Sequence, residues 1–502
     1  MPRVSYAWEK FSAVPIASAK MAIFLAEPHF RRRDRVIEVY DSLSRRLVEF
    51  KPRIPGHVSI YTCGVTPYDH SHLGHARPAV VWDVIRRHLR RRGYVVTYVQ
   101  NYTDIDDKII RRASEVNEPV DTLSSRYIAE YHTMLERLGV IPPDFAPRVT
   151  ENIESIIGYI QALVEKQQAY EADGSVYFRV KGDPEYGRLS RRKVDEMLEG
   201  VRVELEPEKE YAGDFALWKR ARLGEPAWSS PWGPGRPGWH IECSAMSLKY
   251  LGAEFDMHGG GMDLLFPHHE NERAQSRAYL GHEPVSLWVH AGLVTRGSVK
   301  MSKSLKNGIT LNELLSRFSG RVIRTYLLRE HYRSPLDFDE SQISEWAQAL
   351  LRIDRLWEDV KGAPAAGELP AGDWAQPLAT FEDRFLAAMD NDFNTAQAFA
   401  EVFDMVRAAN RGIDQNHADV ARGLARRNLV QADEVLGFLD SKPESAGPDR
   451  KLAEELVQRR DRARRMHNFA LADDLRDVLT AAGYEVLDGS DGTRIHYLGG
   501  GQ

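Results

Sequence analysis

The stretch Cys63-Gly-Val-Thr-Pro-Tyr-Asp-His-Ser-His-Leu-Gly-His75 decides the fold, because a strand pattern leads into it and a helix pattern leads out of it. Val58–Thr62 is a short β-branched and aromatic run, which is typical of a strand. Within Ala79–Arg92, apolar residues recur at helical spacing until Gly93 ends the helix. Tyr94–Val99 is apolar again and predicts a second strand.

Strand, helix and strand in that order predict a right-handed βαβ unit and a parallel sheet. Strand patterns that resume at Glu254–His258 and Val285–His290 predict the second half of the same sheet. The expected fold class is therefore α/β, with a doubly wound, Rossmann-like catalytic domain. Ligands of such sheets bind beyond the carboxyl ends of the strands. Cys63 and His72 fall at that edge, so we expect both in the functional site.

The chain has 502 residues, which is too long for one hydrophobic core and predicts roughly two to four domains. It contains no run of about 20 apolar residues, so no membrane partner is expected. A net charge of −6 neither favours nor excludes nucleic acid, because local patches decide that question. Cys63 and Cys243 are the two cysteines, which argues against a disulfide-stabilised secreted protein and predicts a cytoplasmic one.

Changes in composition divide the chain into segments. Mixed, charged sequence after about Pro142 predicts an insertion, helical patterns dominate from Leu311 to about Leu439, and Ser441–Pro448 has the composition of a linker. We predict an N-terminal extension (1–33), the first half of the catalytic domain (34–141), a connective insertion (142–227), the second half of the catalytic domain (228–310), two sets of helices (311–375 and 376–440), a linker (441–448) and a small C-terminal α/β module (449–502).

His72-Leu-Gly74-His75 stands at a predicted strand-to-helix turn and indicates a phosphate site. Backbone N–H groups and the helix dipole attract anions at such a turn. Gly74 would let a flat base approach the backbone closely. The two imidazoles can donate hydrogen bonds to phosphate oxygens as negative charge develops on them.

A second polar loop, Lys300-Met-Ser-Lys303-Ser, lies downstream of the second half of the predicted sheet. Its lysines, interleaved with serines, suit a loop that closes over a polyphosphate. Together with His72-Leu-Gly-His75, this loop resembles the class I aminoacyl-tRNA synthetases. The resemblance implies that His72, His75, Lys300 and Lys303 neutralise the triphosphate of MgATP in the transition state.

The two cysteines could share a metal ion with the segment around Pro267, a residue that suits the first turn of a helix. His268 and Glu272, at i and i+4, would then project from one face of that helix. Two thiolates from Cys63 and Cys243, one imidazole and one carboxylate make a plausible zinc set.

The choice of histidine stays open on spacing alone. His269 and Glu272, at i and i+3, would serve almost as well as His268 and Glu272. A capped helix start without any metal is a further interpretation of the same segment.

Longer motifs narrow the resemblance to one family, the cysteinyl-tRNA synthetases, from about residue 35 to the C-terminus. The chain departs from the family's usual pattern at Val65 and Pro67, and the residues before 34 lie outside it. The matching motifs are Cys63-Gly-Val-Thr-Pro-Tyr-Asp69, Asn101-Tyr-Thr-Asp-Ile-Asp-Asp-Lys108, Asp214-Phe-Ala-Leu-Trp218, Gly238-Trp-His-Ile-Glu-Cys243 and His258-Gly-Gly-Gly-Met-Asp-Leu-Leu-Phe-Pro-His-His-Glu-Asn-Glu272.

This resemblance implies one zinc ion per chain, with L-cysteine, ATP and tRNA(Cys) as partners. We further predict a monomer. Zinc would select cysteine over serine without an editing domain, since it binds a thiolate strongly and an alcohol poorly. The implied site residues are Cys63, Cys243, His268 and Glu272 for zinc; Gly64, Thr103 and Trp239 for the substrate cysteine; and His72, Gly74, His75, Gly259, Gly260, Gly261, Asp263 and Lys303 for ATP.

The resemblance also implies that the helices after Leu311 contact the tRNA stem, that 376–440 is an anticodon-binding bundle and that 449–502 is a recognition module. RNA binding needs basic surface. The candidate residues are Arg86, Arg87, Arg90, Arg91, Arg92, Arg191, Arg192, Lys193, Arg459, Arg460, Arg462, Arg464 and Arg465.

Two rival functions fit parts of the sequence. A mycothiol-pathway ligase, which joins cysteine to an amino-sugar, has a similar catalytic core but lacks the long tail that follows Met389 here. A catalytically silent paralogue would only bind zinc or RNA, and the intact lysine and histidine motifs argue against it.

Overall fold

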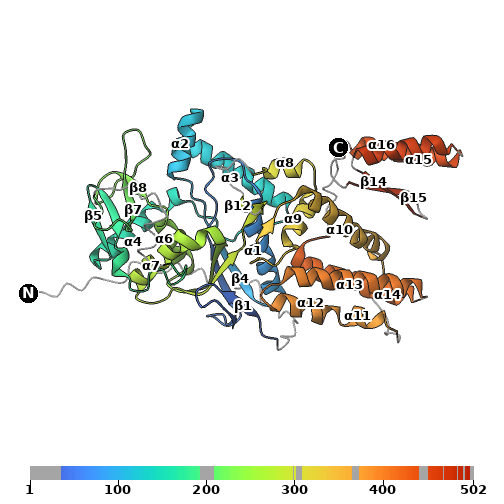
Figure 1. Cartoon of the computed structure of the whole chain (residues 1–502), viewed down its shortest axis with the longest axis horizontal. Coiled ribbons are helices and arrows are strands. Elements are labelled where there is room, and N and C mark those ends of the chain that lie inside the picture. The colour runs from blue at the N-terminus through green and yellow to red at the C-terminus, as the bar shows by residue number, and fades with distance from the viewer. Residues whose placement is uncertain are drawn as a thin grey trace, which may run out of the picture.

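The computed structural model describes residues 35–192, 208–297, 299–300, 308–364, 372–415, 417–439, 450–466, 468–482, 484–489 and 492–497. The predicted extension (1–33), the linker (441–448) and Lys303 lie outside the described residues. Figure 1 shows the central sheet between an insertion on one side and a stack of helices on the other, with the C-terminal unit at the far end. No described helix combines the length and apolar character that crossing a membrane requires.

The central sheet has four parallel strands in the order β10-β9-β3-β4. They are β3 (His57–Thr62), β4 (Val95–Gln100), β9 (Phe255–Gly261) and β10 (Val285–Ala291). The chain passes from β3 to β4 on one side and later returns to β9 on the other side of β3. The predicted doubly wound sheet is confirmed, and its switch point, where ligands bind in such folds, lies between β3 and β9.

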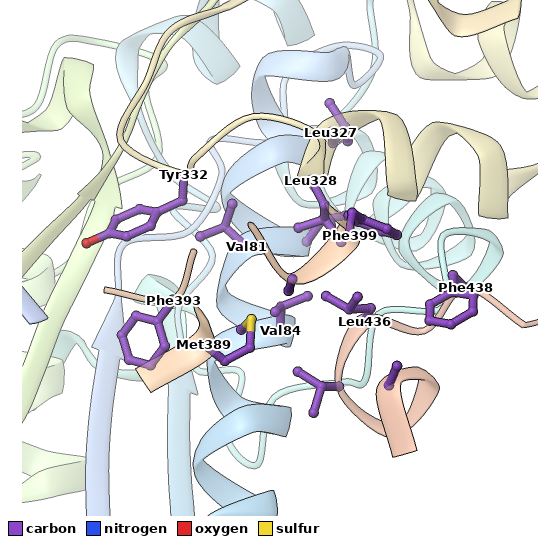
Figure 2. Packing of buried hydrophobic residues seen from close by; sticks show 14 of the residues in the cluster. Val81, Val84, Leu327, Leu328, Tyr332, Met389, Phe393, Phe399, Leu436 and Phe438 are labelled. Atoms are coloured by element: carbon purple, nitrogen blue, oxygen red, sulfur yellow. The ribbon is translucent and has the colours of Figure 1, made fainter. Parts of the chain in front are cut away.

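Helix α1 (Leu73–Arg91) connects β3 to β4 and packs on both of its faces. Trp82 faces the sheet, where a Cβ on Gly259 would lie 2.0 Å from its ring. Val81 and Val84 face the helical stack and pack near Met389 and Leu436 (Figure 2). The helix that carries the histidine motif is therefore fixed between two layers of the molecule.

A hairpin of β1 (Glu38–Asp41) and β2 (Arg46–Glu49) covers the β10 edge of the sheet. Trp288 N–H donates to Asp41 Oδ1 over 3.1 Å, and Ser42 N–H donates to the Trp288 carbonyl over 2.8 Å. These bonds satisfy backbone groups at an edge that would otherwise be open for pairing.

Between β4 and β9 lie the helices α2, α3 and α4 and an antiparallel sheet in the order β5-β6-β7-β8. This sheet continues to Pro237, beyond residue 227 where the sequence analysis places the return to the catalytic domain. The elements are α2 (Asp107–Val116), α3 (Val120–Arg137), η2 (Val149–Glu151), α4 (Ile153–Glu165), β5 (Ala169–Ala172), β6 (Ser175–Phe178), η3 (Val180–Gly182), β7 (Phe215–Arg220), β8 (Gly235–Pro237) and α6 (Ile241–Leu251).

After β9 the chain forms two short turns and then helix α7, followed by β10 and a small sheet in the order β12-β11-β13. Helices dominate from Leu311, as predicted. The elements are η4 (Met262–Leu264), η5 (Leu265–His269), α7 (Glu270–Leu280), β11 (Val294–Arg296), β12 (Val299–Lys300), α8 (Leu311–Leu315), α9 (Gly320–Leu328), β13 (Leu336–Asp337), α10 (Glu340–Val360), α11 (Ala375–Ala379), α12 (Phe381–Asp390), α13 (Thr395–Asp414) and α14 (Ala418–Leu436).

The C-terminal unit contains α15 (Arg450–Arg465), α16 (Phe469–Ala481) and an antiparallel hairpin of β14 (Tyr484–Gly489) and β15 (Gly492–Tyr497). Arg460, a predicted RNA contact, is 3% exposed and pairs with Asp488 over 2.7 and 2.9 Å. That prediction was wrong for Arg460, because its charge is used inside the unit.

The arginine run at the end of α1 corrects a second prediction. Arg86 is buried and bonds Asp83 over 3.2 Å, and Arg87 bonds the same carboxylate over 2.7 Å. Arg91 and Arg92 reach acidic groups of the helical stack, Glu382 at 3.2 Å and Asp390 at 3.2 Å. Arg91 and Arg92 join α1 to the helical stack, whereas Arg86 and Arg87 are held by Asp83 of α1 itself. Their charges are used inside the molecule and do not form the predicted basic RNA surface.

Candidate functional site

Four side chains from three parts of the chain converge at the switch point. The ligating atoms of Cys63, Cys243, His268 and Glu272 all lie within 4.8 Å of one another. The Sγ atoms of the two cysteines are 3.4 Å apart, and Cys63 Sγ is 3.1 Å from Glu272 Oε1. His268 Nε2 is 3.0 Å from Glu272 Oε1 and 3.6 Å from Cys243 Sγ.

This arrangement fits a zinc ion. Metal–ligand distances of about 2.0–2.3 Å in a tetrahedral site place the ligand atoms roughly 3–4 Å from one another, as they are here. Glu272 places Oε1 among the other donors, while its buried Oε2 lies 3.3 Å from His258 Nε2 and makes no hydrogen bond among the described residues. Two soft sulfurs together with imidazole and carboxylate favour zinc over calcium or magnesium.

Local structure places each ligand. Cys63 follows β3, and its N–H donates to the Gly259 carbonyl of β9 over 3.1 Å, so the thiol lies at the switch point. Cys243 is the third residue of α6. His268 belongs to the turn η5 and Glu272 to the first turn of α7, so the expected i, i+4 pair is formed across the junction of the two.

The structure distinguishes His268 from His269, between which the sequence spacing could not choose. His268 Nε2 faces Cys243 and Glu272, whereas His269 Nδ1 contacts His290 Nε2 over 2.8 Å. A second possible group joins Cys63 and Glu272 with His258 and His269. The first group contains both thiolates and is the better zinc set.

The electrostatics of the cluster favour a cation. Burial, with help from Cys243 and Glu272, raises the pKa of the Cys63 thiol well above its ordinary value. Burial lowers the pKa of His268, but Glu272 and Cys243 outweigh burial and raise that pKa to about 10. Acidic groups this close together compete for positive charge, which a divalent metal would supply.

Aromatic and amide groups surround the ligand residues and contact them from outside the cluster. The Trp239 ring stacks on the His268 ring with centroids 4.3 Å apart, and His240 Nδ1 contacts His268 Nδ1 over 3.0 Å. Asn101 Oδ1 accepts from Gly64 N–H over 3.0 Å and lies 3.6 Å from Cys243 Sγ. Such outer contacts orient metal ligands and tune their affinity.

Gly64 lets the chain after Cys63 pass close to the backbone of the neighbouring strand end. A Cβ at this position would lie 1.7 Å from the Asn101 carbonyl oxygen. We expect Gly64→Ala to displace Cys63, to lower zinc content, and to destabilise the fold by about 1–3 kcal/mol through overpacking. Zinc analysis and thermal unfolding measure the two effects.

Gly158→Ala is the matched control, because a Cβ there meets nothing within 4 Å in the middle of α4. The same zinc content and melting temperature in both variants would contradict the role given to Gly64.

Thr103 lies beside the ligand cluster and contacts a carboxyl that sequence reasoning did not single out. Thr103 Oγ1 donates to Glu242 Oε2 over 2.8 Å, and the two residues are 3% and 1% exposed. Burial, followed by the nearby Cys243, raises the pKa of the Glu242 carboxyl well above its ordinary value. The Thr103 N–H donates to the Val65 carbonyl over 3.2 Å, a backbone contact that does not depend on which side chain stands at position 65.

The two motif histidines form a capping box at the start of α1. His72 Nδ1 accepts from Gly74 N–H over 3.1 Å, and His75 Nδ1 accepts from His72 N–H over 3.4 Å. Because Nδ1 accepts in both rings, each ring carries its proton on Nε2. The rings stack with centroids 3.9 Å apart. A Cβ on Gly74 would lie 2.9 Å from His72 Cε1, so glycine permits the ring to fold back.

The residues on either side of the lysine loop are paired with β11 and with the histidine motif. Lys300 belongs to β12, and its backbone pairs with Thr295 of β11. Residues 301–307, with Lys303 among them, lie outside the described residues. Thr310 then forms a bridge with His72, and Leu311 N–H donates to the Ser71 carbonyl over 2.8 Å. The chain after the loop is thus attached directly to the histidine motif.

The glycines of β9 have different neighbours. Gly259 makes room for Trp82 of α1, so packing alone already requires a glycine there, and the approach of adenosine stays a prediction. A Cβ on Gly260 would meet Leu264 at 2.8 Å, and one on Gly261 would meet Asp263 Oδ1 at 2.5 Å.

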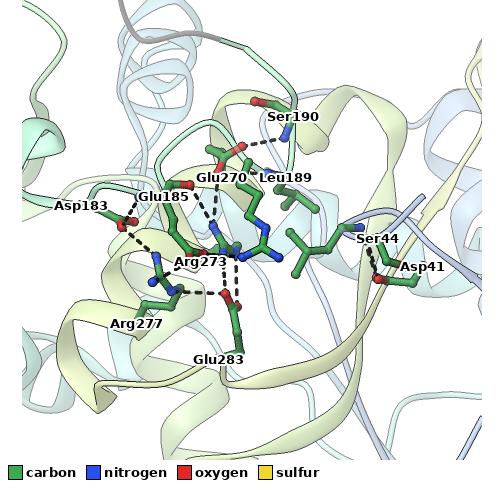
Figure 3. A network of polar contacts seen from close by, with 12 residues as sticks. Asp41, Ser44, Asp183, Glu185, Leu189, Ser190, Glu270, Arg273, Arg277 and Glu283 are labelled. Atoms are coloured by element: carbon green, nitrogen blue, oxygen red, sulfur yellow. Dashed lines mark hydrogen bonds and ion pairs between the residues drawn. The ribbon is translucent and has the colours of Figure 1, made fainter. Parts of the chain in front are cut away.

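Polar contacts join the insertion to α7, the helix that carries Glu272 (Figure 3). Buried Arg273 bonds Glu185 Oε2 over 2.7 Å and Glu283 Oε2 over 3.1 Å. Arg277, one turn later, bonds Asp183 over 2.7 Å. These bonds connect the insertion directly to the helix that carries Glu272.

The chain matches the family of tRNA synthetases class I (C) catalytic domains over residues 49–348 and the DALR domain over residues 384–440. Relatives include cysteine–tRNA ligase of Geobacter metallireducens, 47% identical over 480 residues, which covers 91% of this chain and 99% of the relative. The enzyme of the same name from Thermococcus onnurineus is 45% identical over 469 residues, covering 91% of this chain and 98% of the relative.

Solved structures with a similar fold include Mycobacterium tuberculosis methionyl-tRNA synthetase in complex with methionyl-adenylate, with a TM-score of 0.57 and 17% identity over 80% of this chain and 94% of that one. A second is the LeuRS–tRNA–LeuAMS complex of Agrobacterium radiobacter K84, with a TM-score of 0.58 and 11% identity over 78% of this chain and 85% of that one. At these identities the likeness concerns the fold.

Proposed function

This chain belongs to the cysteine–tRNA ligase family of the class I tRNA synthetases, and from that premise we propose which of its residues carry out each part of the reaction. The reaction joins L-cysteine to tRNA(Cys) in two steps. ATP activates the carboxylate of cysteine as cysteinyl-adenylate and releases pyrophosphate. The cysteinyl group then passes to the terminal adenosine of the tRNA.

We propose that Cys63, Cys243, His268 and Glu272 hold one zinc ion. The convergence of four such donors at the switch point supports this assignment. When bound there, zinc would favour the thiolate of cysteine over the hydroxyl of serine, because it binds thiolate strongly and lowers the pKa of the thiol. Trp239, stacked on His268, would border the side chain of the substrate.

ATP would bind along the edge between the histidine motif and the β9 turn. The carboxylate of cysteine is ionised near neutral pH, so its attack on the α-phosphate needs no general base. Positioning and charge neutralisation then carry catalysis. Nε2–H groups of His72 and His75 would donate to phosphate oxygens, with Lys300 and Lys303 supplying positive charge.

Adenosine would lie near Gly260 and Gly261, with Asp263 bonding the ribose, and Gly74 would leave room for the base. Gly64 and Thr103 would contact the substrate cysteine. We assign the segments 311–375, 376–440 and 449–502 to the tRNA stem, the anticodon and a further recognition surface. We also propose a cytoplasmic monomer, in which both cysteines serve the metal site.

Cysteine-dependent ATP–pyrophosphate exchange, charging of tRNA(Cys) and metal analysis test these assignments together. We expect all three, with one zinc per chain and loss of exchange on chelation. Exchange without tRNA charging would point to an amino-sugar ligase. Zinc without exchange would point to a silent paralogue.

A further inference from the structure

We propose that Glu242, acting through Thr103, selects and positions the ammonium group of the substrate cysteine. This inference rests on the proposed function, since it concerns the amino acid bound beside the zinc ligands. Glu242 precedes the ligand Cys243 on α6, yet it is not itself part of either possible metal-binding group.

Glu242 is a buried carboxyl group that no lysine or arginine compensates among the described residues. It is 1% exposed, and among the described parts of the chain no lysine or arginine forms an ion pair with it. A buried carboxylate is costly unless a cation compensates for it. A site that keeps such a group suits a cationic ligand, and the only cation that cysteine carries is its ammonium group.

The direction of the Thr103 hydrogen bond specifies what the threonine can bind. A hydroxyl has one proton, and Thr103 donates that proton to Glu242 over 2.8 Å. Its oxygen can therefore only accept hydrogen bonds from elsewhere. Asn101 Nδ2 makes one long contact with this oxygen, 3.5 Å, which leaves acceptor capacity for a ligand. An ammonium group satisfies that acceptor, whereas the carboxylate of the substrate would be repelled.

The same asparagine links this acceptor to the metal site. Asn101 Oδ1 lies 3.6 Å from Cys243 Sγ, while its Nδ2 faces Thr103. In cysteine, only Cβ and Cα separate the sulfur from the ammonium nitrogen. A sulfur held at the zinc ligands therefore places the ammonium among these neighbouring side chains. Glu242 is a positioning residue here, because it acts through Thr103.

Glu242→Gln tests the charge while keeping an acceptor for the Thr103 proton. The probes are L-cysteine and 3-mercaptopropionate, which has the thiol and carboxylate but no ammonium. We expect the Kd for cysteine to rise about 10- to 100-fold, as for loss of a charged hydrogen bond. The Ki of 3-mercaptopropionate should change less than about threefold, and zinc content should remain that of the wild type.

Thr103→Ser and Thr103→Val provide a matched pair that bears on the same claim if Glu242→Gln folds poorly. Serine keeps the hydroxyl and should bind cysteine nearly as the wild type does, whereas valine should show the selective loss. Equal weakening of both probes, or unchanged cysteine binding, would overturn the proposal. A wild-type protein without zinc or without cysteine-dependent exchange would instead overturn the proposed function.

Discussion

Cys63→Ser is expected to lower zinc affinity by two or more orders of magnitude and to abolish most of the preference for cysteine over serine. Outer-sphere partners of a metal are worth about 10- to 100-fold in affinity, so loss of a thiolate ligand should cost at least as much. Without the metal, only pocket shape would separate two substrates that differ by sulfur and oxygen. Shape alone gives about 100-fold.

Zinc content by mass spectrometry and pyrophosphate exchange with each amino acid measure these effects. Ser247→Ala is the matched control, since Ser247 is buried in the same helix as Cys243 and bonds the Ser244 carbonyl, away from the ligand set. It should retain zinc and selectivity. Wild-type zinc content and selectivity in Cys63→Ser would rule out the proposed ligand set.

His72→Asn and His72→Gln should separate the two tasks of this histidine. Asparagine places an acceptor where Nδ1 stands and is a good N-cap residue, so the start of α1 should remain stable. It offers no donor at the position of Nε2. We therefore expect the rate of adenylate formation to fall about 10²- to 10³-fold, the usual effect of removing one preorganised donor.

Glutamine reverses the pattern. Its amide can reach the position of Nε2, but it leaves the Gly74 N–H without its capping acceptor. Stability should fall by about 1 kcal/mol, and more of the rate should remain than in His72→Asn. Single-turnover kinetics and thermal unfolding of both variants test this. Equal rates in the two variants would show that the Nε2 donor does not act in the reaction.

Part of the fold could be predicted from the local periodicity of apolar residues. The βαβ unit and the helical C-terminal half follow from apolar spacing, which acts between near neighbours in the chain. The histidine motif was predicted at the strand-to-helix turn, where α1 does start, but apolar spacing marks the helix only from Ala79, because its cap is two histidines and Pro78 stands inside the helix. Histidine is not among the usual capping residues.

Other features had no local signal. The run Arg86–Arg92 has the composition of an exposed basic surface, but acids about 300 positions later, such as Glu382 and Asp390, pair with it. His258 and Glu242 contact the site, and both lie in the quoted motifs, but nothing in those motifs indicates what either side chain does.

By itself, the sequence determined the sheet, the order of its elements, and the residue types at the carboxyl ends of its strands. Only the tertiary structure decided which histidine joins Cys63, Cys243 and Glu272, because His290 contacts the alternative, His269. The physical reason is how far apart in the sequence the interacting residues lie. Backbone periodicity depends on adjacent residues, whereas ligand geometry and charge pairing depend on distances between segments that only folding brings together.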